Sequence, residues 1–418
     1  MLLHRIVLIL VAGFWGLGLA CAPGLAHEVP GAAQASAAPA SKPARKPRAQ
    51  LGIDAAFAPD GSLWWVGLDG DNQLTLRSAP PAQGTAGWQW SAPRVLATGT
   101  DPISADGENH PKLLFGPNAL VLIAYTMPLP AFHTGWVRML RSTDGGQSFS
   151  APFTVHADQQ PITHRFESIG LDARGQLHAV WIDSRDAELA PRERGRSRYR
   201  GAAIYTARSD DGGATFGPDT KVADHSCECC RIALTRGNDG QLHALWRHVF
   251  EPDVRDHAFA TLGTQPTPAV RASFDDWHIK GCPHHGPGLA PASDGGFHAT
   301  WFGIRQEGGQ AVPGIRYGRL QADGSPVADS VRRVPDERAE HADVAAFGQR
   351  VAVVWRSTDG MTTALKAWLS ADGGQHFQVR TLAQAVGDND HPRLAQRGEH
   401  LVVVWRTQKE VQVHDIPW

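Results

Sequence analysis

The 418-residue chain is poor in several residue types, and each scarcity narrows its chemistry. It has five cysteines, four methionines, four tyrosines and a formal net charge of −2. Because the charge is balanced, no strong field attracts nucleic acid or an anionic membrane. So few methionines argue against a methionine-rich copper carrier. After the N-terminal segment no convincing amphipathic helix occurs, which leaves strands as the main elements.

The N-terminal segment, residues 1–26, has the pattern of an export signal. A short basic start precedes an apolar core, and small-residue cleavage sites end at Ala22 and Ala26. Cys21 in "LGLAC" offers the alternative of a lipid-anchored bacterial lipoprotein. Both predict a periplasmic or secreted protein, in a compartment that permits disulfides. Residues 27–50, rich in Ala, Pro, Ser and Lys, predict a disordered linker.

The rest of the chain is rich in glycine (44), proline (29) and tryptophan (14), and it repeats one pattern. A short apolar run, a glycine-containing turn and a second apolar run recur at 51–69, 109–127, 166–185, 230–248, 286–305, 341–358 and 391–408. Short runs rich in Val, Leu, Ile and aromatics favour strands. The spacing is typical of a propeller with four strands in each blade.

The sequence therefore predicts an all-β fold, a β-propeller of four-stranded blades over residues 51–418. Seven strand pairs favour seven blades, with six as the alternative. Tryptophans that end the second runs are expected to fill the gaps between blades: Trp181, Trp246, Trp301, Trp355 and Trp405. We expect a monomer.

Three loops share a second motif, "STDGGQSF" (142–149), "SDDGGATF" (209–216) and "SADGGQHF" (370–377). In each, an aspartate can accept backbone N–H groups and a glycine can adopt positive φ: Asp144, Asp211 and Asp372, followed by Gly146, Gly213 and Gly374. This motif resembles the Asp-box, or BNR repeat, of sialidase-like propellers. The resemblance implies a fold and a structural role, not a function.

Propeller geometry brings distant residues to one face. The first strand of each blade starts, and the second strand ends, at the same mouth of the central channel. First-strand starts and the segments before them carry His110, His164, Cys229, Cys230, Arg231, Cys282, His284, His285, His341 and His391. Second-strand ends carry Asp183, Arg185, Arg247, His248, Arg305, Arg356 and Arg406.

Thiols and imidazoles at one mouth suit Cu or Zn. The sequence predicts one such ion on some of Cys229, Cys230, Cys282, His285, His110, His341 and His391. Disulfides are the alternative, because Cys227, Cys229, Cys230 and Cys282 are an even number. The histidines could equally bond backbone carbonyls.

The pair of motifs "CECCR" and "GCPHHGP" resembles a subgroup of exported bacterial sialidase-family proteins, for which no activity is implied. Sialidase chemistry needs an arginine triad, a Tyr–Glu nucleophile pair and an aspartate. The candidates are Tyr125 or Tyr317 with Glu167, then Asp183, and a carboxylate clamp of Arg231, Arg247, Arg356 and Arg406. The first-blade arginine motif of sialidases is missing.

Three functions stay open at this stage. The mouth could bind a small-molecule, metal or glycan ligand, the protein could be an exo-sialidase-type glycoside hydrolase, or it could be a non-catalytic propeller that binds a protein or glycan. The sequence does not decide whether the protein is an enzyme.

Overall fold

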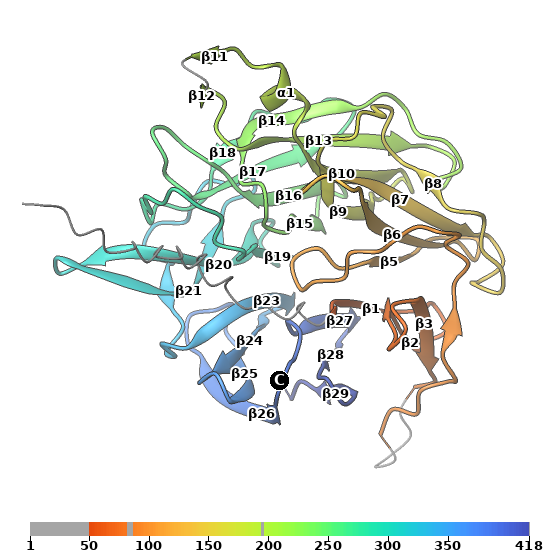
Figure 1. Cartoon of the computed structure of the whole chain (residues 1–418). Helices are drawn as coiled ribbons and strands as arrows, with labels where there is room; N and C mark the ends of the chain where they lie inside the picture. The colour runs from red at the N-terminus through yellow and green to blue at the C-terminus, as the bar shows by residue number, and fades with distance from the viewer. Residues whose placement is uncertain (1–49, 82–86, 194–195, 418) are drawn as a thin grey trace, which may run out of the picture. The chain divides into compact units, whose positions relative to one another are not determined.

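Seven antiparallel sheets form a ring around a central channel in the computed structural model, which describes residues 50–81, 87–193 and 196–417 (Figure 1). Successive first strands pack against one another in the order β1, β5, β9, β15, β19, β23, β27 and back to β1. The predicted all-β propeller and its seven blades are confirmed. The predicted signal peptide, Cys21 and nearly all of the linker lie outside the described residues.

The first six blades have four strands each. Blades 1 and 2 are β1 (Ile53–Phe57), β2 (Leu63–Leu68), β3 (Leu74–Ala79), β4 (Arg94–Val95), then β5 (Lys112–Phe115), β6 (Val121–Pro128), β7 (Gly135–Ser142) and β8 (Phe153–Thr154). Blades 3 and 4 are β9 (His164–Leu171), β10 (Leu177–Asp183), β13 (Ala202–Ser209), β14 (Thr220–Ser226), then β15 (Ala233–Arg236), β16 (Leu242–Arg247), β17 (His257–Leu262) and β18 (Val270–Arg271). Blades 5 and 6 are β19 (Gly288–Pro291), β20 (Phe297–Glu307), β21 (Gln310–Leu320), β22 (Arg332–Arg333), then β23 (Ala339–Phe347), β24 (Arg350–Thr358), β25 (Thr362–Ser370) and β26 (Gln378–Val386).

The seventh blade has three strands, β27 (Arg393–Arg397), β28 (His400–Arg406) and β29 (Val411–Asp415), whereas the other six have four. An insertion in blade 3 carries α1 (Arg185–Leu189), β11 (Arg192–Glu193) and β12 (Arg196–Ser197). Within the described part of the chain, no helix is long and apolar enough to cross a membrane.

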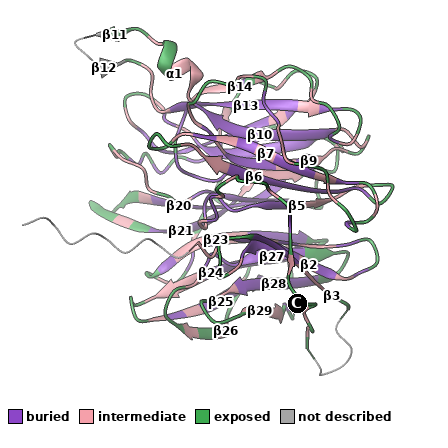
Figure 2. Ribbon diagram, turned by 45° about the vertical axis from the view of Figure 1, so that its right-hand side comes forward, coloured by how far each residue is buried: buried purple, intermediate pink, exposed green. Residues whose placement is uncertain are grey.

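Apolar side chains of neighbouring blades pack face to face between the sheets, and the inner strands that carry them are mostly buried (Figure 2). The repeated tryptophans are buried in these layers, as the sequence predicts: Trp181, Trp246, Trp301, Trp355 and Trp405. Each buries about 150–250 Å², which contributes on the order of 4–6 kcal/mol before entropic costs.

Aspartates on and beside the first strands join neighbouring blades through backbone groups. Asp54 Oδ2 accepts the N–H of Leu113 in blade 2 at 2.8 Å. Asp343 makes the same kind of contact between blades 6 and 7. Asp390 Oδ2 accepts the N–H of Ile53 at 3.1 Å, which joins the last blade to the first. The ring is therefore closed by hydrogen bonds from backbone N–H groups to aspartate side chains and by apolar packing between blades.

The three loops with the Ser-x-Asp-Gly-Gly motif adopt one geometry. In the first, Asp144 Oδ1 accepts the N–H of Ser148 at 2.9 Å, and the Ser142 hydroxyl donates to the same oxygen at 2.7 Å. Gly146 has a φ of 85°. The contacts recur at Asp211 and Asp372. All three loops follow third strands, so they lie at the opposite face from the mouth.

Replacing Asp390 by alanine is expected to weaken ring closure. The change leaves the N–H of Ile53, which is fully buried, without an acceptor, at a cost of about 1–3 kcal/mol. Urea unfolding followed by tryptophan fluorescence measures this cost. Asp390→Asn keeps an acceptor and should lose less, and Asp388→Ala, at an exposed position, should be neutral. Equal stability of Asp390→Ala and Asp388→Ala would contradict the closure role.

Candidate functional site

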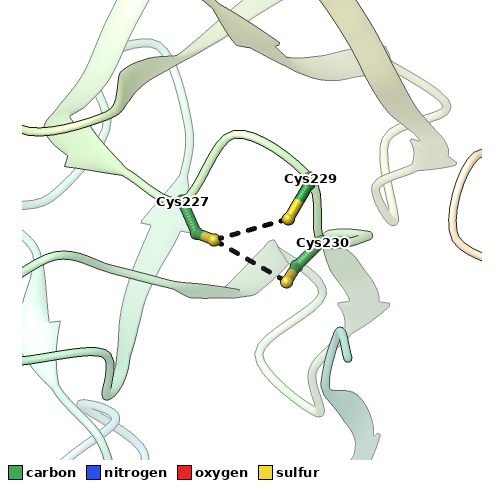
Figure 3. A group of neighbouring side chains, drawn as sticks. All are labelled: Cys227, Cys229 and Cys230. Atoms are coloured by element: carbon green, nitrogen blue, oxygen red, sulfur yellow. Dashed lines mark hydrogen bonds between the residues drawn. The ribbon is translucent and has the colours of Figure 1, made fainter. Parts of the chain in front are cut away.

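Four thiols gather where the segment before β15 meets the segment before β19. Cys227 Sγ lies 3.8 Å from both Cys229 Sγ and Cys230 Sγ (Figure 3). The Cys282 thiol also interacts with those of Cys227 and Cys229. All four are free, so none of the disulfides considered from the sequence forms in the described structure. Cys282 does meet the "CECC" segment, as expected for adjacent blades.

The cluster favours the thiolate at one sulfur, because the pKa of Cys227 is lowered whereas the pKa values of Cys229, Cys230 and Cys282 are raised. Hydrogen bonds from the other three thiols hold the pKa of Cys227 well below its ordinary value, and the Arg255 guanidinium lowers it further. Burial raises the pKa of Cys230, and the Arg247 guanidinium opposes that rise. Both arginines are buried, and neither forms an ion pair with a carboxylate among the described residues. The thiols therefore lie beside two buried positive charges that no acid neutralises.

A second cluster is built around Glu108, in the segment that enters blade 2. Its Oε2 accepts the N–H groups of Arg231 at 2.9 Å and Gly286 at 2.8 Å. Its Oε1 accepts Arg231 Nη1 at 2.9 Å and contacts His341 Nδ1 at 3.2 Å. Burial alone would raise the pKa of Glu108, but Arg231 and His341 hold it well below its ordinary value. The carboxylate is thus ionised and joins four blades.

Three imidazoles stack beside this carboxylate. His341 lies between His391, with ring centroids 3.4 Å apart, and His285, at 4.3 Å. Phe302 covers the other face of His285. Burial lowers the pKa of His285 to about 2 and lowers those of His341 and His391. The three rings are therefore neutral and each keeps a nitrogen lone pair.

Each of the two sequence motifs serves both clusters. "CECCR" supplies three thiols to the first cluster and Arg231 to the second. "GCPHHGP" supplies Cys282 to the first cluster, and His285 and the Gly286 N–H to the second. Glycine is needed at 286 because a Cβ there would meet Arg231 and Glu108. The two clusters are thus built on the same two segments.

Backbone strain marks the mouth. Phe166 and His341, near the starts of β9 and β23, have φ values of 59° and 51°. The pairing of both strands shifts register there, as at a β-bulge. A left-handed non-glycine residue costs of order 1–3 kcal/mol. The strain coincides with the position at which His341 contacts Glu108.

The channel contains a cavity of about 210 Å³, lined by residues from all seven blades. Lys112, Arg231 and Arg393 contribute positive charge to its wall, and Asp54 and Asp343 contribute negative charge. Burial lowers the pKa of Lys112 to about 8, against the opposing pull of Glu167 and Asp54. A lysine that titrates so close to neutrality can exchange a proton.

The seven predicted metal ligands do not form one site. Cys229, Cys230 and Cys282 belong to the thiol cluster, and His285, His341 and His391 belong to the imidazole stack. His110 belongs to neither, because its Nδ1 pairs with Arg393 Nη2 at 2.9 Å beside the channel cavity. Sequence reasoning left Cys227 out of the ligand set and missed Glu108, whose only signal is its place just before His110.

The four arginines proposed as a substrate clamp instead join neighbouring parts of the ring. Arg231 pairs with Glu108 and donates to the Ala342 carbonyl. The other three donate to backbone carbonyls: Arg247 to those of Arg255, His285 and Phe302, Arg356 to that of Asn389, and Arg406 to that of Leu68. They do not converge as a carboxylate clamp.

The sialidase candidates are also apart. Tyr125 donates to Asp101 at 2.8 Å, Tyr317 contacts His298 Nδ1 at 2.7 Å, and Glu167 accepts the Thr126 hydroxyl at 2.6 Å. Asp183 pairs with Arg185. Both candidate tyrosines bond to groups other than Glu167, and burial raises the pKa of both, which disfavours a nucleophilic phenolate.

Comparisons with known proteins give the fold. No family model and no curated sequence matches the chain. It is similar to a PL25 ulvan lyase, a polysaccharide lyase, at 12% identity over 88% of this chain and 92% of that chain, with a TM-score of 0.56. It is similar to the α-L-arabinofuranosidase Arb93A of Fusarium graminearum at 11% identity over 72% of this chain and 88% of that chain, with a TM-score of 0.52. The Hadza microbial sialidase Hz136 matches at 12% identity over 86% of this chain and 74% of that chain, with a TM-score of 0.49. The first two likenesses show a shared propeller fold.

Truncating Glu108 is expected to destabilise the mouth strongly. Glu108→Ala leaves the buried Arg231 guanidinium without its carboxylate, and breaking a buried pair in this way costs about 3–5 kcal/mol. Urea unfolding of metal-free protein measures the loss.

The matched control is Glu337→Ala, which breaks an exposed pair with Arg333 and should cost less than about 1 kcal/mol. Similar losses in the two variants would show that Glu108 does not hold the blades together.

Proposed function

We propose that the protein binds one thiophilic transition-metal ion, Zn(II) or Cu(I), at the cluster of Cys227, Cys229, Cys230 and Cys282. The observation that carries this proposal is the pair of 3.8 Å Sγ–Sγ distances. A tetrahedron with metal–sulfur bonds of about 2.3 Å has edges of about 3.8 Å. A disulfide requires about 2.05 Å. The spacing therefore fits sulfurs that share an ion rather than a bond.

The charges around the cluster support the same assignment. Four thiolates around a divalent ion leave a net charge of −2, which is costly in a buried site unless cations compensate it. Arg247 and Arg255 supply two cations without carboxylate partners of their own among the described residues. His257 is a further buried group close to Cys227, and its Nε2 has no hydrogen-bond partner. A metal–thiolate centre would give the guanidinium groups of Arg247 and Arg255 a negative partner and the ring nitrogen of His257 a sulfur acceptor.

The ligand chemistry selects the kind of ion. Cysteine sulfur favours Cu(I) and Zn(II) over the hard ions Mg(II) and Ca(II). The predicted export segment places this site in a compartment where disulfides compete with metal for the same sulfurs. The buried "CECC" thiols, held about 3.8 Å apart, are protected from direct oxidation while the ion is bound. Metal capture, storage or stabilisation of the mouth are the roles that such a centre can serve.

Metal titration of reduced, metal-free full-length protein tests the proposal. We expect Zn(II) to bind with a Kd far below 10 μM, an affinity of more than about 7 kcal/mol. Cys227→Ser removes the thiol that contacts all three others and should weaken binding by at least about 100-fold, roughly 2.7 kcal/mol.

Met361→Ser is the control, because it replaces an exposed sulfur-containing side chain outside the cluster, and it should bind like the parent. Binding no tighter than about 10 μM, or unchanged affinity in Cys227→Ser, would overturn the proposal.

A second candidate function is action on an acidic polysaccharide, as in the PL25 ulvan lyase whose fold is similar. The specific observation in its favour is the channel cavity of about 210 Å³, where Lys112 has a pKa of about 8 beside Arg231 and Arg393. Arginines can hold a sugar carboxylate and a neutral lysine can act as a general base. The separated tyrosines and Glu167 give the sialidase alternative no comparable support.

Under this candidate, the protein forms unsaturated uronate ends on ulvan and leaves sialyllactose intact. Activity should rise as the pH passes through about 8 and level off above it, because the lysine must lose its proton to act as a base. Lys112→Met should reduce the rate at least about 100-fold, whereas Lys409→Met, at an exposed position, should not. Absence of new ultraviolet absorbance on ulvan would remove this candidate.

A further inference from the structure

We infer that the mouth holds a second metal site, separate from the thiols, in which Glu108, His341 and His391 bind one borderline divalent ion of the Zn(II) or Cu(II) class. One oxygen and two nitrogen atoms of these residues lie within 4.8 Å of one another. They come from blades 2, 6 and 7, so only ring closure brings them together.

The geometry directs all three groups to one point. His341 Nδ1 lies 3.2 Å from Glu108 Oε1, and His391 Nδ1 lies 3.5 Å from the same oxygen. Glu108 Oε2 is fully used by two backbone N–H groups, from Arg231 and Gly286. These contacts fix the carboxylate so that Oε1 faces the imidazoles, as supporting hydrogen bonds orient ligands in metal sites.

Unpartnered nitrogens are the independent sign of a missing ligand. His391 is more than nine-tenths buried, and its Nδ1 has no hydrogen-bond partner. The Nδ1 of His285, whose ring stacks on His341, also has none. Leaving buried polar atoms unpaired is unfavourable, because they lose their bonds to water without gaining others. Glu108 Oε1 already accepts Arg231 Nη1 and can accept one imidazole N–H besides, whereas an ion beside Oε1 would bind the Nδ1 atoms of both imidazoles at once.

The donor set distinguishes this site from the thiol cluster. Two imidazoles and a carboxylate suit Zn(II) and Cu(II), whereas four thiols suit Zn(II) and Cu(I). The two sites share the segments around Arg231 and Gly286 but no ligand. Each can therefore be removed without deleting a ligand of the other.

Calorimetric titration of Zn(II) into reduced, metal-free full-length protein separates the two sites. The parent should bind two equivalents, and Cys227→Ser should lose the ion at the thiol site. His391→Ala should lose the ion at the other site, whose affinity for Zn(II) should fall at least tenfold. His400→Ala, an exposed histidine paired with Asp415, is the matched control and should bind two. Retention of the thiol-site ion in His391→Ala shows that this variant is folded, and His391→Asn provides a second variant with a polar side chain of similar size.

Co(II) spectra give a second readout. The Cys227→Ser protein should bind one Co(II) without sulfur charge-transfer bands, and His391→Ala should keep those bands. One equivalent that disappears with His391→Ala but survives Cys227→Ser supports this site and overturns the thiol site. Binding of two equivalents of Zn(II) by both His391→Ala and His391→Asn would overturn the inference. So would the finding that no bound ion depends on His391.

Discussion

The buried ion pair between Glu108 and Arg231 is the contact on which the rest of the mouth depends. It lies where first strands from the whole ring converge, and the same carboxylate receives Gly286 and His341. The segments that supply Arg231 and Gly286 also carry the four thiols. Because a buried carboxylate needs its cation and its N–H donors at the same time, the Glu108 contacts fix the path of both segments. The thiol cluster and the imidazole stack follow from that path.

A propeller suits such a centre because its axis collects side chains that are far apart in sequence. Each blade is stabilised by packing on its neighbours, with tryptophans between them. Arginines at second-strand ends and aspartates on and beside first strands then tie blade to blade through backbone groups. Among the described residues, the buried groups at the mouth that lack a hydrogen-bond partner include two Arg255 nitrogens and the Nδ1 atoms of His285 and His391.

The fold was predictable from the sequence because strand patterns and turns are local and repeat seven times. Repeat geometry also placed the cysteines and histidines at one mouth. It could not separate them into two clusters, because that depends on loop paths and on Glu108, a single acid in a connecting segment. The roles of Arg247, Arg356 and Arg406 were equally hidden, since a guanidinium on backbone carbonyls leaves no sequence signature.

X-ray absorption at the zinc edge of protein loaded with one equivalent of Zn(II) tests the central claim most directly. The four-thiol centre predicts a first shell of four sulfurs at about 2.3 Å, with no disulfide formed. A first shell of nitrogen and oxygen at about 2.0–2.1 Å, or one sulfur or none, would contradict the account, because the ion would then bind elsewhere and the 3.8 Å spacing of the thiols would need another explanation.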